Sequence, residues 1–175
     1  MDHFARLGLP AALDLEPAAL DKAYFALQRQ WHPDRFVGKA PEDRARASSE
    51  AAALNDAYRT LKDPLARAVY FAGLNGVELP GDGKTIDDPE LLMEAMDARE
   101  ALHDAATAQA VDALAAKARQ DMQAALAGLG TLFLANDKAA IRKALLRLRY
   151  LDKFAEEARA RRTNLEREPF KSFGQ

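Results

Sequence analysis

The chain has 175 residues, 49% of them hydrophobic, so it is long and apolar enough to fold as one large or two small domains. A formal net charge of −2 argues against nucleic acid as the main partner, because such a partner usually requires a strong basic field. The absence of cysteine excludes disulfides, thiolate metal ligands and cysteine nucleophiles. With no signal peptide and no apolar run of roughly 20 residues, a protein of the cytoplasm that does not enter the membrane is expected.

The first part of the chain is predicted to be helical, because Ala, Leu, Arg and Glu dominate and β-branched residues are scarce. Residues 4–9 form a short opening turn or helix. Pro17 suits the first position of the next helix, which runs to Trp31 with apolar residues recurring on one face. Pro33 disfavours helical angles at His32, so this helix ends there.

A loop over 32–40 is followed by a helix that Pro41 opens and whose apolar stripe ends at Leu61. The two helices run in opposite directions along the chain, which predicts an antiparallel hairpin with the loop at its tip. Asp63 then caps a short helix that begins at Pro64.

Asn-Gly, Pro-Gly and Asp-Gly pairs lie close together between residues 74 and 88, and such turn signals indicate a domain boundary. We therefore predict a first domain over 1–75, a linker over 76–87 and a second domain over 88–175. The second domain is expected to contain three helices, at about 88–105, 107–128 and 136–165. Their short connections imply antiparallel neighbours, so an all-α chain ending in a three-helix bundle is predicted.

The tripeptide His32-Pro33-Asp34 lies at the predicted hairpin tip. Pro33 stiffens the backbone, so His32 and Asp34 are presented in a fixed relation, which lowers the entropic cost of docking a partner. An ordinary helix-ending loop and a catalytic His–Asp pair are the alternatives, and the second lacks a recognisable nucleophile. The flanking helices and the position near the start of the chain are typical of a J-domain, which docks on a DnaK-type chaperone and activates its ATPase.

Longer segments of both halves resemble the HscB family, the J-type co-chaperones of iron–sulfur cluster assembly. The similar segments are DHF (2–4), LGLP (7–10), LQRQWHPDRF (27–36), NDAYRTLKDPLARAVY (55–70), LLME to RE (91–100) and LRYLDK (148–153). The resemblance thus extends over nearly the whole chain and in order.

The resemblance implies that the chain is not an enzyme but an activator of an HscA-like, DnaK-type chaperone, and that it needs no cofactor. It implies that His32, Pro33 and Asp34 contact the chaperone. It assigns three basic helpers to the same contact: Lys22, Arg29 and Arg35. Phe25 and Ala26 stand where many general J-domains have basic residues, which favours a dedicated chaperone. The three histidines show no metal-ligand spacing, so no metal site is predicted.

The resemblance also implies that the bundle binds an IscU-type scaffold protein and delivers it to the chaperone. On the first bundle helix the apolar residues of one face should form core: Leu91, Ala95, Ala98, Leu102 and Ala105. Leu92, Met93 and Met96 fall outside this stripe, and an apolar cluster there is typical of an interaction surface. Tyr150 is predicted to lie off the core stripe of the last helix, with Leu146 as its neighbour.

The predicted scaffold site therefore contains Leu92, Met93, Met96 and Tyr150, rimmed by Asp97 and Glu100. Packing of these residues against the first domain is one alternative. A different client and pairing of the apolar patch with itself in a dimer are two others.

Overall fold

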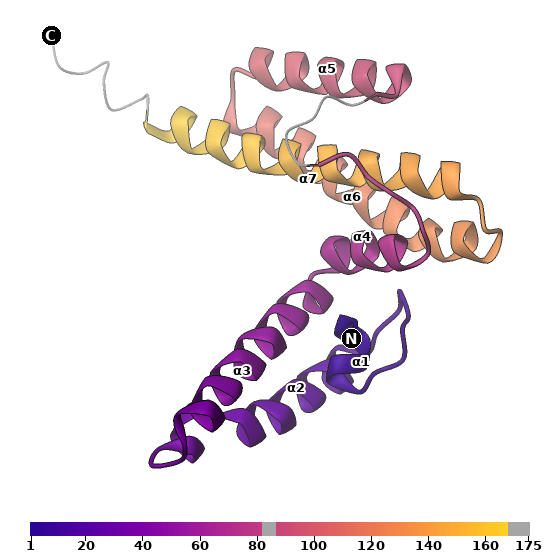
Figure 1. Ribbon diagram of the computed structural model, residues 1–175. Coiled ribbons are helices and arrows are strands. Elements are labelled where there is room, and N and C mark those ends of the chain that lie inside the picture. Colours follow the sequence, from indigo (N-terminus) through magenta and orange to yellow (C-terminus); the bar gives the residue numbers. More distant parts are fainter. Residues whose placement is uncertain (82–86, 168–175) are drawn as a thin grey trace, which may run out of the picture. The chain divides into compact units, whose positions relative to one another are not determined.

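The computed structural model describes residues 1–81 and 87–167 (Figure 1). These residues form helices and no strand, which confirms the all-α prediction. The chain divides into two compact units, Met1–Gly76 and the residues from Val77 onward. Residues 82–86 of the predicted linker and 168–175 of the predicted second domain lie outside the described residues.

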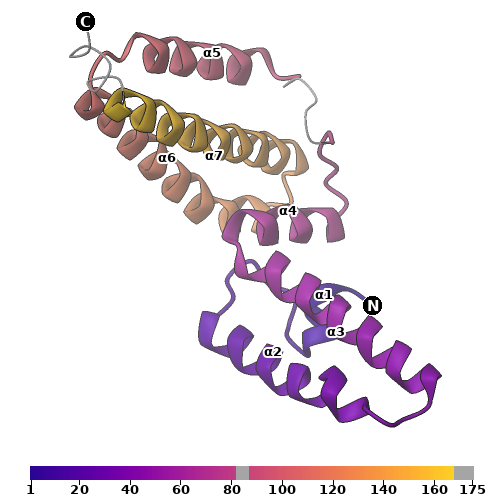
Figure 2. The same cartoon turned by 90° about the vertical axis from the view of Figure 1, so that its left-hand side faces the viewer.

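The first unit contains a helical hairpin with two flanking helices. Its elements are α1 (His3–Leu7), α2 (Pro17–Trp31), the 3-10 helix η1 (Pro33–Phe36), α3 (Pro41–Lys62) and α4 (Pro64–Leu74). α2 and α3 pack against each other in antiparallel directions, and α1 packs on both (Figures 1 and 2). The prediction of a hairpin between short helices is therefore confirmed.

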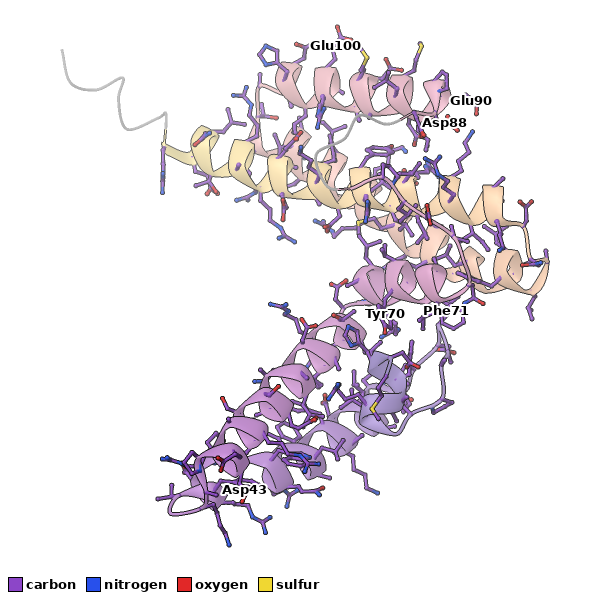
Figure 3. The ribbon with its side chains drawn as sticks, viewed as in Figure 1. Asp43, Tyr70, Phe71, Asp88, Glu90 and Glu100 are labelled. Atoms are coloured by element: carbon purple, nitrogen blue, oxygen red, sulfur yellow. The ribbon has the colours of Figure 1, made fainter. Side chains whose placement is uncertain are left out.

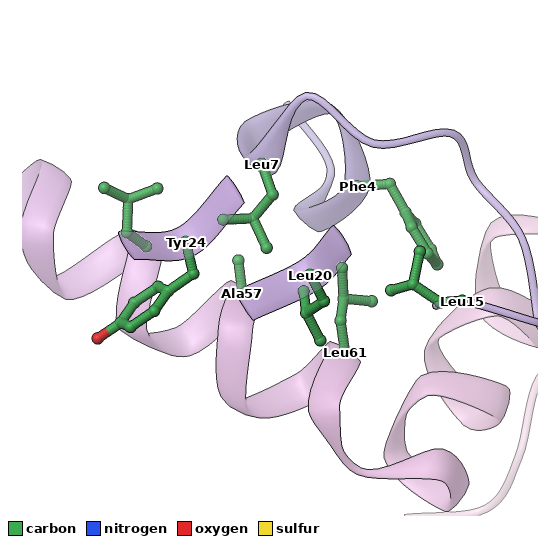
Figure 4. Packing of buried hydrophobic residues seen from close by; sticks show 8 residues of the cluster. Phe4, Leu7, Leu15, Leu20, Tyr24, Ala57 and Leu61 are labelled. Atoms are coloured by element: carbon green, nitrogen blue, oxygen red, sulfur yellow. The ribbon is translucent and has the colours of Figure 1, made fainter. Parts of the chain in front are cut away.

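Buried apolar residues from α1, α2 and α3 hold this unit together (Figure 4). The buried members are Phe4, Leu7, Leu15, Leu20, Tyr24, Leu54, Ala57 and Leu61. Each large member contributes about 1.5–3 kcal/mol by leaving water. Because Leu20 and Tyr24 are four residues apart in α2, and Leu54 and Leu61 are seven apart in α3, each helix presents one continuous apolar face.

Local signals set the ends of these helices. Asp2 caps α1 by accepting a hydrogen bond from the Ala5 backbone N–H at 2.9 Å, and Asp63 caps α4 through the Ala66 backbone N–H. Gly8 ends α1 with φ 67°, a left-handed conformation that favours glycine. The predicted loop over 32–40 differs from the structure, because Pro33 opens a short 3-10 helix there.

The second unit is a three-helix bundle made of α5 (Pro89–Asp104), α6 (Ala108–Leu134) and α7 (Lys138–Arg167). α6 and α7 pair along their length, and α5 lies on α7 (Figures 1 and 2). The core between them joins residues of all three helices: Leu102, Val111, Ala115, Ala118, Leu151, Phe154 and Ala158. Ile141, Leu145 and Leu148 continue the buried face of α7.

The predicted end of the middle helix at Gly128 is wrong. α6 continues through Gly128 and Gly130 to Leu134, and Asn136 then takes the left-handed φ of 52°. Each interior glycine costs about 1 kcal/mol relative to alanine. Burial of Leu129 between these glycines offsets that cost, because its side chain leaves water.

Candidate interaction sites

The His32-Pro33-Asp34 tripeptide occupies the tip of the α2–α3 hairpin. α2 ends because His32 adopts φ −61° and ψ 129°, extended angles that Pro33 imposes on the residue before it. The tripeptide is exposed, with 51% of the His32 side chain and 87% of the Asp34 side chain accessible to solvent. The structure therefore presents both polar groups outward on a short, locally ordered turn.

His32 uses one ring nitrogen to hold this turn. Its Nδ1 accepts a hydrogen bond from the Asp34 backbone N–H at 3.3 Å. An accepting Nδ1 assigns the proton of the neutral imidazole to Nε2, which leaves Nε2–H as the donor toward a partner. The Asp34 Oδ2 lies 3.6 Å from Nδ1, beyond hydrogen-bond distance. The pair is therefore not arranged as a catalytic dyad, in which the ring would donate to the carboxylate.

Two of the predicted basic helpers adjoin the tripeptide. Arg35 of η1 donates from Nη1 to the Arg29 carbonyl oxygen at 3.3 Å, and Arg29 donates from Nε to the Phe25 carbonyl oxygen. Lys22 is also exposed on α2, seven residues before Arg29 and therefore about 10 Å along the helix axis. Exposed Phe25 lies between them on the same face, so this surface combines basic groups with an aromatic ring.

The helix α5 carries the predicted scaffold patch. Leu91, Ala95 and Leu102 are buried. In contrast, Leu92, Met93 and Met96 are 37%, 64% and 60% exposed. Asp97 and Glu100 are exposed beside them, and Figure 3 shows Glu100 on α5. The structure thus separates the core side of α5 from an outward apolar patch, which we define as Leu92, Met93 and Met96.

The structure places Tyr150 and Leu146 differently from the sequence prediction. Leu146 is buried, and Tyr150 is half-buried and packs against the core of the bundle. The Tyr150 hydroxyl donates to Glu94 Oε1 at 2.7 Å. Burial of the ring, together with this hydrogen bond, raises the pKa of Tyr150 well above its ordinary value. The physical reason for Tyr150 is that α5 lies on α7 and supplies Glu94 as a partner, a contact that a projection of α7 alone does not show.

Glu94 and Arg147 were missed by the sequence reasoning. Arg147 donates to Glu94 Oε1 from Nη2 at 2.7 Å and from Nε at 3.0 Å, so this oxygen receives bonds from two residues of α7. Burial opposes ionisation of Glu94, but the bonds from Arg147 and Tyr150 outweigh it and lower the pKa of Glu94. The network fixes the register of α5 on α7 within one turn of Met93.

Ion pairs extend this attachment along α5. They join Arg142 to Asp87 at 2.6 Å, Lys143 to Glu90 at 2.5 Å and Arg99 to Glu157 at 3.1 Å. Figure 3 shows Asp88 and Glu90 together at the start of the helix. Each exposed pair contributes at most about 1 kcal/mol, but the set specifies one alignment of the helices. The sequence signal for this alignment is the matched spacing of acidic residues at 87, 90 and 94 and basic residues at 142, 143 and 147.

Two other kinds of feature are not found in the described part of the chain. No three histidine or acidic side chains within it come together as a candidate metal site. None of its helices combines the length and apolarity needed to cross a bilayer.

Two family models match this chain. The DnaJ domain matches residues 2–70, and the HSCB C-terminal oligomerisation domain matches residues 87–159. A co-chaperone protein HscB homolog of Burkholderia multivorans is 41% identical over 167 residues, which cover 94% of this chain and 95% of the relative. The homolog of Cupriavidus taiwanensis is 40% identical over 159 residues, with coverages of 89% and 90%.

Solved structures agree with these matches. Chaperone HscB from Vibrio cholerae has a TM-score of 0.81 to this chain at 32% identity, with coverage of 94% of this chain and 99% of that one. Human co-chaperone protein HscB has a TM-score of 0.85 at 25% identity, with coverages of 91% and 81%. The two models match the two units in order, and the identity holds over almost the full length. The chain therefore belongs to the HscB family of J-domain co-chaperones.

Proposed function

We propose that this chain activates the ATPase of an HscA-like, DnaK-type chaperone and delivers an IscU-type scaffold protein to it during iron–sulfur protein maturation. It acts in the cytoplasm and carries out no catalytic step of its own. Family membership supports the co-chaperone role. The observation that carries the proposal is that each unit presents its own exposed surface: the tripeptide on the first and the apolar patch on the second.

The tripeptide supports the chaperone-facing role because its polar groups are exposed yet held in place. The Nε2–H of His32 and the carboxylate of Asp34 are offered to a partner from a turn that Pro33 stiffens, so little conformational freedom is lost on docking. Exposed Lys22, Arg29 and Arg35 add positive charge, which would attract an acidic chaperone surface and speed association.

The apolar patch supports the scaffold-facing role. Methionine side chains adapt to the shape of a partner, and their burial would provide most of the binding free energy. Exposed Asp97 and Glu100 would form a polar rim that selects orientation. Tyr150 belongs to this site as a residue that positions α5 through Glu94.

A steady-state ATPase assay with the purified HscA-like chaperone tests the first role. The full chain should stimulate ATP hydrolysis, and His32→Gln should abolish the stimulation while leaving the thermal melt of the chain unchanged. No stimulation by the wild-type chain, or equal stimulation by His32→Gln, would contradict the proposal.

A binding titration with the IscU-type scaffold tests the second role, with an unrelated client as a specificity control. Combined alanine substitution of Leu92, Met93 and Met96 should weaken scaffold binding at least tenfold and leave basal chaperone stimulation intact. Leu134→Ala is a matched control, because Leu134 is 91% exposed on α6 and remote in sequence from the patch. A collapsed circular-dichroism melt of the triple variant would instead indicate that these residues are core.

Self-association of the apolar patch is the second candidate role, and it is favoured by the patch itself and by the oligomerisation domain named in the matching family model. Sedimentation of the chain alone distinguishes self-association from scaffold delivery. A monomer that binds the scaffold supports delivery, whereas a dimer that the triple alanine variant dissociates supports self-pairing.

A further inference from the structure

An aromatic stack lies directly behind the exposed tripeptide. Trp31 is the last residue of α2 and Phe36 the last residue of η1, so the two aromatic rings bracket the tripeptide in sequence. Their ring centroids are 6.0 Å apart and their planes differ by 2°, which is a parallel stack. From α3, the Arg46 guanidinium carbon lies 5.5 Å from the centroid of the Trp31 ring. Side chains of three elements therefore meet at the base of the turn.

This stack joins the turn to the body of the hairpin. η1 packs on α3 but contains no buried residue, so no side chain of the turn is anchored in the core. Trp31 packs against the core cluster of the first unit and also stacks on Phe36. The hydrogen bonds of the turn are local: the Asp34 and Arg35 backbone N–H groups both donate to His32, at 3.3 and 3.0 Å, and the Arg35 guanidinium donates to the Arg29 carbonyl oxygen. They shape the turn, but none of these three bonds joins it to α3.

We propose that Trp31, Phe36 and Arg46 are positioning residues, which hold His32, Pro33 and Asp34 in the orientation that a DnaK-type chaperone engages. The inference rests on the proposed chaperone-activating function and extends it to residues outside the tripeptide. If the stack is lost, the tripeptide samples more orientations, and only the fraction in the engaged orientation binds. The apparent affinity for the chaperone then falls by that fraction, while the maximal stimulated rate is retained at saturation.

Arg46 gives the sharpest test because it is exposed on α3 and outside the core, so its replacement leaves the fold intact. Arg46→Gln should raise the concentration of chain needed for half-maximal ATPase stimulation by up to about fivefold, the limit set by the loss of one cation–π contact. Arg46→Lys keeps a cation over the ring and should restore the wild-type titration. Arg44→Gln removes an equal charge from the same helix and should leave the titration unchanged.

Fluorescence of the free chain provides a second measurement that needs no chaperone. Trp31 is the single tryptophan of the chain, so its emission reports on the surroundings of this one ring. Arg46→Gln and Phe36→Leu should each make Trp31 more accessible to acrylamide, and Arg46→Lys should not. If these residues only stabilised the fold, the variants would have a lower melting temperature. They would not show a raised half-maximal concentration together with an unchanged maximal rate.

The outcomes distinguish this inference from the proposed function. If the wild-type chain fails to stimulate the chaperone, the proposed function fails, and the quenching experiment still decides whether the stack holds the turn. If the wild-type chain stimulates and Arg46→Gln titrates identically, the positioning role is overturned and the function stands. An equal rise of the half-maximal concentration in Arg44→Gln also overturns it, because loss of charge then explains the effect. The same holds if Arg46→Gln raises this concentration without a change in Trp31 quenching, because direct contact of Arg46 with the chaperone then explains it.

Discussion

Removing the hydroxyl of Tyr150 tests whether this residue positions α5 or contacts the scaffold directly. In Tyr150→Phe the ring keeps its packing in the bundle, while Glu94 Oε1 loses a donor at 2.7 Å. A hydrogen bond to a charged group contributes about 1.5–3 kcal/mol. Because the Glu94 side chain is 37% exposed, solvent screening reduces this to about 1 kcal/mol. Such a loss increases the population of the detached α5 roughly fivefold.

Amide hydrogen exchange followed residue by residue is the appropriate assay, because it reports local opening of single helices. Exchange should accelerate about fivefold along α5 and remain unchanged in the centre of α6. Tyr58→Phe is a matched control, since the Tyr58 hydroxyl donates to the Asp21 carboxylate at the same 2.7 Å within the first unit. This control should leave α5 exchange unaffected.

The refuting result is unchanged exchange in α5 of Tyr150→Phe. If scaffold affinity nevertheless falls in that variant, the hydroxyl contacts the scaffold directly, as the sequence alone suggested. If exchange accelerates and affinity falls in proportion, Tyr150 acts through the alignment of α5 that displays Met93 and its neighbours.

Other consequences of the structure are open to equally direct measurement. Gly128→Ala should raise the free energy of unfolding in urea by about 0.5–1 kcal/mol, because Gly128 is helical with open space at its Cβ position, whereas Gly8→Ala should lower it at φ 67°. If both substitutions changed the free energy of unfolding in the same direction, the explanation from backbone conformation would be contradicted. Leu148→Ala, at a fully buried site of α7, should lower the same free energy by about 2–5 kcal/mol, and a loss below 1 kcal/mol would place Leu148 outside the core. The hydrogen bond from Arg142 lowers the pKa of Asp87, and the pKa of Glu94 is also lowered. The stabilisation that these two carboxylates give α5 should therefore be full above their ordinary pKa values of 3.8 and 4.5, and it should disappear as pH falls through the lowered values. Amide exchange of α5 measured against pH, corrected for the intrinsic rate, checks this. A pH-independent opening free energy of α5 would refute it.

Much of the fold is predictable because it depends on local patterns. The helix from Pro17 to Trp31 and its end at His32 follow from apolar spacing and from the effect of Pro33, and both agree with the structure. The outward position of Met93 and Met96 follows from the same periodicity and is confirmed by their exposure. The J-domain and HscB family resemblance is also confirmed.

Errors arose where a distant helix changes the surroundings of a residue. Gly128 resembles a helix end in isolation, yet α6 continues past it and Leu129, the next residue, is buried. Tyr150 lies off the main stripe of α7 in a helical projection, yet α5 covers it and supplies Glu94 as a hydrogen-bond partner 56 residues away. Propensity and periodicity carry no information about which neighbour covers a side face.

Apart from the end of α6 and the 3-10 turn η1, the amino-acid sequence by itself therefore determined the helices, the tripeptide at the hairpin tip and the division of α5 into a core side and an apolar patch, because each depends on residues within a few turns of one another. Only the tertiary structure decided the alignment of α5 on α7 and the Trp31–Phe36–Arg46 stack. Both depend on the rotation and register of packed helices, which result from side-chain contacts between segments far apart in the chain.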